Sequence, residues 1–150
     1  MQKSKFFTFV GISFLVLALA SVRFFEKNWF YDPFILFFKG EYHHKDLPDF
    51  DFVKLGLHYL LRYSINCILS LAILYLWFKE IKLIKDFLII YAIAFVVLFL
   101  GFSLLVFMNE PNLSILFYVR RFLIQPLFLV LFMPALLYQK MLKSKEVIKN

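Results

Sequence analysis

The feature that most constrains this chain is a repetition of apolar runs, each about as long as a bilayer is thick. Four such runs cover residues 6–25, 55–78, 87–108 and 113–138. A helix of about 20 apolar residues crosses the hydrocarbon core of a membrane, which is roughly 30 Å thick. Within 150 residues, these runs leave no length for a sizeable soluble domain. We therefore predict a single all-α domain, residues 1–150, folded as an integral membrane four-helix bundle.

Composition supports a membrane protein and argues against a nucleic-acid-binding one. Hydrophobic residues make up 63% of the chain, with 22 Phe, whereas a soluble domain is nearer half apolar. A formal net charge of +7 would suggest nucleic acid as a partner for a soluble protein. Here the lysines cluster beside the apolar runs, so we predict the lipid bilayer as partner and no nucleic acid.

Lysine positions predict the topology. Two lysines precede the first run, three lie between the second and third, and four follow the last run. With four crossings all nine fall on one side, which the positive-inside rule places in the cytoplasm. We expect a multi-pass protein of the bacterial inner membrane with both termini cytoplasmic. The Ala18-Leu19-Ala20 sequence is also typical of signal-peptidase sites, and cleavage there would leave the later spans oriented alike.

The outer segment, residues 26–54, contains a short helix signal. Asp32-Pro33 is a good helix start, because Asp caps free N–H groups and Pro suits the first turn. An apolar stretch follows over 34–38, and Lys39-Gly40 then ends it. The stretch is too short to span a membrane. We predict a short interfacial helix in this first outer loop.

The four arginines all lie within or beside apolar runs. Arg23 is 18 residues after Lys5, Arg62 is 17 before Lys79, and Arg121 is 19 before Lys140. At about 1.5 Å per residue, these separations are roughly 25 to 29 Å. The arginines, including Arg120, are therefore expected at one level, near the outer edge of the hydrocarbon core.

Polar residues extend this level along two helix faces. His58, Arg62 and Asn66 share one face, and Tyr118, Arg121 and Gln125 share another. Such stripes should face other helices rather than lipid. The candidate binding residues are Arg23, His58, Arg62, Asn66, Arg120, Arg121 and Gln125.

Three interpretations of these arginines stay open. They pair with acids of the outer loops, they form a pocket for an anion such as a lipid phosphate or a carboxylate, or they contact a partner membrane protein. The acidic candidates are Glu26, Asp46, Asp49, Asp51 and Glu110.

Weaker patterns do not complete a catalytic or metal site. His43, His44 and Asp46, with Glu41 or Asp49, have no diagnostic metal-ligand spacing, and a solvated loop is favoured. Cys67 lies about 13 Å from His58 along one helix, so we expect a packed thiol rather than a nucleophile. Pro126 and Pro134 are expected to kink the fourth run. We predict no metal and no cofactor, and no complete catalytic constellation is present.

Three stretches carry a resemblance to a known family. They are Phe30-Tyr31-Asp32-Pro33-Phe34, Leu61-Arg62-Tyr63-Ser64-Ile65-Asn66 and Phe117-Tyr118-Val119-Arg120-Arg121-Phe122-Leu123-Ile124-Gln125-Pro126-Leu127. They resemble the exosortase F system-associated proteins of Bacteroidetes, small membrane proteins encoded beside an exosortase. The similarity covers nearly the whole chain, and the third stretch is the most specific.

The resemblance implies an accessory or scaffold role in an exosortase-linked protein-sorting system. It implies no enzymatic activity, because none is established for the family. The partner would be the exosortase or its sorted substrate. The alternative is a membrane protein that binds a lipid or an anionic substrate through Arg62, Arg120 and Arg121, with or without catalysis. A transporter is the weakest hypothesis, because no charge is expected near the membrane midplane.

Overall fold

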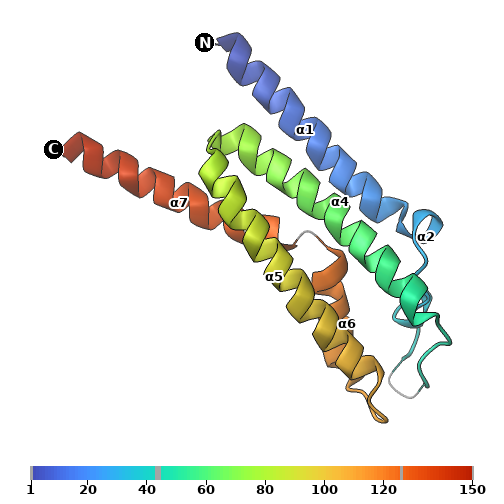
Figure 1. Cartoon of the computed structure of the whole chain (residues 1–150). Helices are drawn as coiled ribbons and strands as arrows, with labels where there is room; N and C mark the ends of the chain where they lie inside the picture. The colour runs from blue at the N-terminus through green and yellow to red at the C-terminus, as the bar shows by residue number, and fades with distance from the viewer. Residues whose placement is uncertain (1, 43–44, 126, 150) are drawn as a thin grey trace.

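The computed structural model describes residues 2–42, 45–125 and 127–149, and all the regular elements in these ranges are α-helices. Four long helices, α1, α4, α5 and α7, carry most of the chain, and two very short ones lie between α1 and α4 (Figure 1). The helices are α1 (Gln2–Phe24), α2 (Glu26–Trp29), α3 (Phe34–Phe37), α4 (Phe52–Phe78), α5 (Ile81–Val106), α6 (Leu113–Ile124) and α7 (Leu127–Lys149).

The helices confirm the predicted class, a multi-pass helical membrane protein. Three helical stretches are long and apolar enough to cross a membrane: all of α4, all of α5, and residues Phe6–Phe24 of α1. A fourth crossing results if α6 and residues Phe128–Gln139 of α7 count as one bent span. The number of crossings is therefore three or four.

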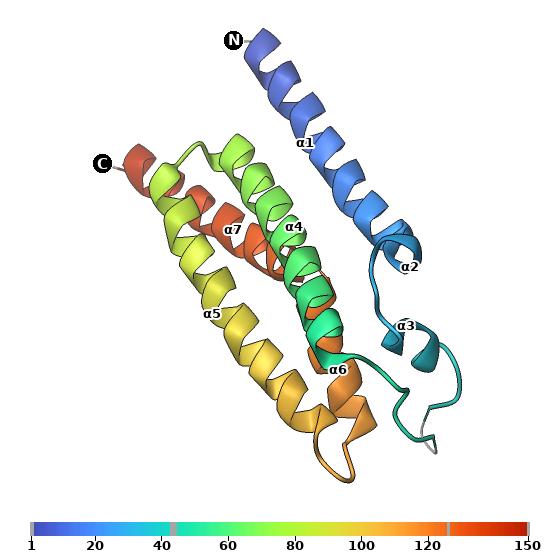
Figure 2. The ribbon, with the colours of Figure 1, turned by 45° about the vertical axis from the view of Figure 1, so that its right-hand side comes forward.

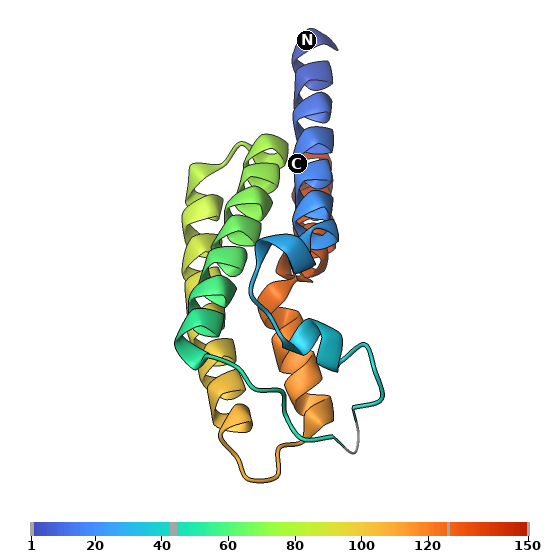
Figure 3. The ribbon, with the colours of Figure 1, turned by 90° about the vertical axis from the view of Figure 1, so that its right-hand side faces the viewer.

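Helix α4 is the centre of the bundle, because α1, α5 and α6 all pack against it. Gly11 permits the close approach of α1, since a Cβ atom there would lie 3.1 Å from Leu76 Cδ1. The chain termini and the α4–α5 connection lie toward one end of the molecule, and α3 and the α5–α6 connection lie toward the other (Figures 2 and 3). This arrangement matches the predicted grouping of the lysine-rich segments at one end.

The ends of the long helices are set by local chemistry. Asp51 caps α4, where its carboxylate accepts a hydrogen bond from the Lys54 N–H at 3.1 Å. At the other end, Lys79 adopts a left-handed conformation with φ of 56°, and its N–H donates to the Tyr75 carbonyl. Helix α5 then begins at Ile81, earlier than the predicted start at residue 87. The predicted basic loop is therefore shorter than expected, because Lys82 and Lys85 already belong to α5.

The predicted run over residues 113–138 is helical but broken close to Pro126, which agrees with the expected kink. Helix α6 ends at Ile124, and the following apolar helix is inclined to it by 65°. Gln125 is extended, with φ of −114° and ψ of 146°. The physical reason is that a residue before proline is disfavoured in the helical conformation. Pro126 itself lies outside the described residues, and Pro134 lies within α7.

The buried apolar side chains form two clusters along α4. One contains Phe34, Leu55, Tyr59, Phe102, Val106, Leu116, Leu123 and Ile124, and the other contains Tyr63, Cys67, Leu71, Leu74, Phe87 and Tyr91. The buried position of Cys67 confirms the predicted packed thiol. Arg62 lies on α4 between Tyr59 of the first cluster and Tyr63 of the second. A charged side chain therefore lies between two aromatic regions of the core.

The predicted short helix exists as α3, and it packs against other side chains of the protein. Phe34 is fully buried, and its ring lies 5.3 Å from that of Phe50 and 5.7 Å from that of Phe102. Aromatic pairs at these distances contribute beyond the burial of their area. Helix α3 is thus a fixed part of the bundle, while its position at a membrane interface stays a prediction.

Candidate functional site

Asp32 is the centre of a buried polar cluster near the outer segment. Its Oδ1 atom accepts hydrogen bonds from the Phe34 N–H at 3.1 Å and from the Tyr59 hydroxyl at 3.2 Å. Its Oδ2 atom accepts from Arg120 Nη2 at 2.5 Å. The carboxylate that the sequence marks as a helix start therefore also binds an arginine from α6.

Arg120 is enclosed on several sides. Its Nε donates to the Tyr59 hydroxyl at 3.1 Å, so Tyr59 accepts from Arg120 while donating to Asp32. The guanidinium carbon lies 5.9 Å from the centre of the Phe38 ring. Arg120 is buried, with 6% of its surface exposed.

Arg62 pairs with Glu26 from α2, through its Nη2 atom and Glu26 Oε2. Its Nη1 atom lies 3.9 Å from Asp32 Oδ2, and the guanidinium lies over the Phe30 ring. Arg62 Nε and Nη1 have no hydrogen-bond partner among the described residues, although Arg62 is only 1% exposed. Two arginines thus face two carboxylates, and their formal charges cancel.

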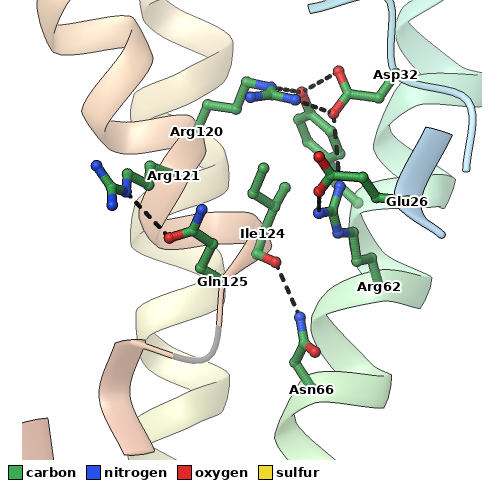
Figure 4. A network of polar contacts seen from close by, with 9 residues as sticks. Glu26, Asp32, Arg62, Asn66, Arg120, Arg121, Ile124 and Gln125 are labelled. Carbon is green, nitrogen blue, oxygen red and sulfur yellow. Dashed lines mark hydrogen bonds and ion pairs between the residues drawn. The ribbon is translucent and has the colours of Figure 1, made fainter. Parts of the chain in front are cut away.

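Asn66 extends the cluster to the break in the fourth run. Its side-chain amide donates to the Ile124 carbonyl at 3.0 Å (Figure 4). This carbonyl lies in the last turn of α6, where main-chain oxygens have no helical partner. The predicted polar face of α4 therefore satisfies the backbone of the broken helix.

Arg121 and Gln125 behave differently from the buried pairs. Arg121 Nε donates to Gln125 Oε1 at 3.1 Å, and both side chains extend away from the ion-paired cluster (Figure 4). Arg121 is exposed, as is Arg23 at the end of α1. Neither has a carboxylate within 4 Å among the described residues.

These two arginines line one pocket of about 230 Å³. Its charged lining residues are Arg23, Glu26, Lys39, Arg120 and Arg121, and the others are Ile35, Phe38, Phe117, Ile124 and Gln125. Glu26 and Arg120 are already engaged in the ion-paired cluster. The uncompensated lining is therefore basic, with an apolar wall formed by α3 and α6.

The pKa of Lys39, which lines the pocket, reflects the positive charge that surrounds it. The neighbouring Lys27 side chain, through a hydrogen bond and charge repulsion, lowers the pKa of Lys39 below its usual value. The carboxylate of Glu26 opposes that shift but does not reverse it. The rim of the pocket thus carries more cations than anions.

The remaining predicted residues lie elsewhere. His58 is half-buried between the rings of Phe30 and Tyr31, and its Nδ1 has no partner among the described residues. Asp46 and Glu110 line a separate cavity of about 400 Å³ beside the α5–α6 connection. Of the five acids proposed as arginine partners, only Glu26 reaches one in the described part of the chain.

The metal hypothesis involves residues that lie partly outside the described ranges. His43 and His44 are among the residues that the structure does not describe. Elsewhere in the described chain, no three His, Cys, Asp or Glu residues gather as a metal-binding group.

Sequence reasoning missed Asp32, Tyr59 and Lys39 as members of the site. Tyr59 precedes Arg62 by one helical turn, so the polar face of α4 also contains a tyrosine. Asp32 is an isolated acid within the aromatic stretch from Trp29 to Phe38, which is itself a signal that it is buried. Lys39 was assigned only as a helix stop.

Fold and site together define a multi-pass helical membrane protein with a buried ion-paired cluster and an adjacent basic pocket. No family model, no curated protein and no solved structure matches the chain. The resemblance to the exosortase F system-associated proteins therefore stays a sequence-based prediction.

Proposed function

We propose that the protein is an accessory or scaffold component of an exosortase-linked sorting system in the bacterial inner membrane. The observation that supports this proposal is the convergence of the three stretches that carry the family resemblance. Asp32 comes from the first stretch, Arg62 and Asn66 from the second, and Arg120 and Ile124 from the third. The resembling residues thus meet in one cluster, where they fix the outer segment to the bundle.

A rigid outer segment suits a protein that presents a surface to a partner. Contacts from α4 and α6 hold Glu26 and Asp32, which precede α3. After α3, the Phe38 ring packs against Phe117 of α6. The described residues around α3 therefore enter a complex with little conformational entropy left to lose. The basic pocket beside this cluster is the surface we assign to partner, substrate or lipid contact.

Co-purification with an exosortase of the same organism tests this role. The full-length protein, tagged and extracted in a mild detergent, is expected to retain the exosortase. A deletion strain is expected to leave substrates unsorted. If the exosortase is missing from the pull-down and sorting is intact in the deletion strain, the proposal fails.

A second candidate is a membrane protein that binds a lipid or an anionic substrate and acts on it. It is favoured by the contrast between Arg120, which is occupied by Asp32, and Arg121, which is exposed beside the pocket. Arg121→Ala is expected to abolish such an activity while leaving the amount of folded protein unchanged. Loss of the protein from the membrane would instead indicate a structural role for Arg121.

A further inference from the structure

The basic pocket has a composition that distinguishes it from an ordinary charged surface. Its cations come from three separate elements: Arg23 from α1, Lys39 from the segment after α3, and Arg121 from α6. Residues that are distant in sequence thus converge on one space. Isolated arginines that only reach toward headgroups do not require such convergence.

The ion-paired cluster explains why these cations stay available. Among the described residues, Glu26 is the only acid that lines the pocket, and it is bound to Arg62. Asp32 is bound to Arg120 and is 9% exposed, so it does not reach the opening. The structure therefore neutralises its buried charges internally, and among the described residues Arg23, Lys39 and Arg121 form no ion pair with a carboxylate.

The remaining lining of the pocket is apolar. Ile35 and Phe38 form one side, and Phe117 and Ile124 form the other. Gln125 adds a side-chain amide that is already oriented by its bond to Arg121. A lining that combines basic and apolar side chains fits a ligand that is anionic at one end and apolar at the other.

Position and size narrow the class of ligand further. Arg23 lies in the last turn of α1, an apolar helix, and Lys39 lies in the outer segment after α3. The volume of about 230 Å³ is below the roughly 300–1,000 Å³ of pockets that enclose whole small molecules. The space therefore fits a headgroup fragment and not an entire lipid.

We propose that Arg23, Lys39 and Arg121, with Gln125, bind a phosphate group, such as the phosphate of an anionic lipid headgroup. Two arginines supply planar donors that match phosphate oxygens, and Lys39 supplies a compact point charge. The apolar wall then receives the first part of the attached chains. This inference rests on the proposed assignment of the pocket as a contact surface and names its ligand.

The test uses the full-length protein reconstituted in vesicles of phosphatidylglycerol mixed with an uncharged glycolipid that has the same acyl chains. After extraction, native mass spectrometry counts each lipid that stays bound. We expect phosphatidylglycerol to be retained in preference to the glycolipid. Arg121→Gln and Lys39→Gln are each expected to weaken its retention about tenfold or more, because each removes a charge-assisted contact. Lys45→Gln is the matched control, since Lys45 is an outer lysine that does not line this pocket.

A second arm distinguishes the two sources of the phosphate. Inorganic phosphate is added to the detergent-solubilised protein, and its protection against thermal unfolding is measured. Protection that Arg121→Gln and Lys39→Gln abolish would assign the site to free phosphate. Absence of protection, with phosphatidylglycerol still retained, would assign it to the lipid.

The proposal is overturned if both lipids are retained equally and inorganic phosphate gives no protection, or if the two variants behave like Lys45→Gln. Circular dichroism of each variant checks its helix content. Arg121 and Lys39 are both exposed, so neither substitution is expected to disturb the fold. If one variant nevertheless fails to fold, the other still tests the site. Failure here with continued exosortase co-purification would reject only the phosphate site. Loss of co-purification with phosphate binding intact would reject only the accessory role.

Discussion

Arg120 Nη2 lies 2.5 Å from Asp32 Oδ2, although 88 residues separate the two in the chain. The contact joins the segment before α3 to the middle of α6, and Tyr59 of α4 bridges the same two side chains. Three elements therefore depend on one carboxylate. Such buried pairs are strongly destabilising to break, because the remaining charge is left without compensation.

The first prediction concerns the pair formed by Arg62 and Glu26. Glu26→Gln leaves the Arg62 guanidinium buried beside a neutral partner, which is expected to cost about 3–5 kcal/mol of unfolding free energy. Arg62→Met is expected to cost less, because the Glu26 side chain is 20% exposed and stays partly hydrated. Unfolding in mixed micelles, followed by circular dichroism, measures both changes.

The double variant Glu26→Gln with Arg62→Met provides the control for that pair. We expect its loss of unfolding free energy to be smaller than the sum of the two single losses, because neither charge of the pair remains without its partner. Strict additivity would mean that the two side chains do not interact in the folded protein.

The second prediction separates the roles of Tyr59 and Asp32. Tyr59→Phe removes one hydrogen bond to each of two charged groups but leaves their ion pair in place, so a loss of about 1–3 kcal/mol is expected. Asp32→Asn leaves Arg120 uncompensated and should cost more. An equal effect of the two substitutions would contradict the central role given to the carboxylate.

The sequence predicted the helical membrane class because lipid imposes length and composition on every span. It also placed Arg62 and Asn66 correctly on one buried face, since 3.6-residue periodicity determines which side chains share a face. It did not identify Asp32 as the main partner of Arg120, because that contact depends on how two distant segments are brought together. The break after Ile124 was indicated by the following proline, but the 65° angle between the two helices was not.

The same reasoning explains the outcome for the arginines. The sequence marked both Arg120 and Arg121 as candidate binding residues, but adjacent residues on a helix point in different directions. Arg120 faces the interior and Arg121 the pocket. Only tertiary structure decides which of the two is neutralised.

The third prediction concerns the hydrogen bond from Asn66 to the Ile124 carbonyl. Asn66→Leu keeps the side chain's approximate size but leaves this carbonyl unpaired, and a loss of about 1–3 kcal/mol is expected. Hydrogen exchange at residues 119–125 should become faster. Asn112→Ala removes the cap at the other end of α6, so it should cost about 0.5–2 kcal/mol without a specific effect at the break. If both variants accelerate exchange at 119–125 alike, the local role of Asn66 is wrong.

The fourth prediction tests the orientation inferred from the lysines. In a Cys67→Ala background, Asp46→Cys is expected to react with a membrane-impermeant maleimide in intact spheroplasts. Lys82→Cys is expected to react only after the membrane is permeabilised. Both positions are exposed in the structure, so burial in the protein does not confound the comparison. The opposite labelling pattern would reverse the assigned topology.

The contact between Asp32 and Arg120 also sets an order of events during synthesis. A ribosome makes Asp32 long before Arg120, so the growing chain carries the carboxylate through most of its insertion without its principal partner. A truncated product ending after α5 would contain Asp32, Tyr59 and Arg62 but lack the guanidinium that completes the cluster. Arrival of α6 therefore completes this cluster, and until then the outer segment lacks one of the contacts that fix it to the bundle.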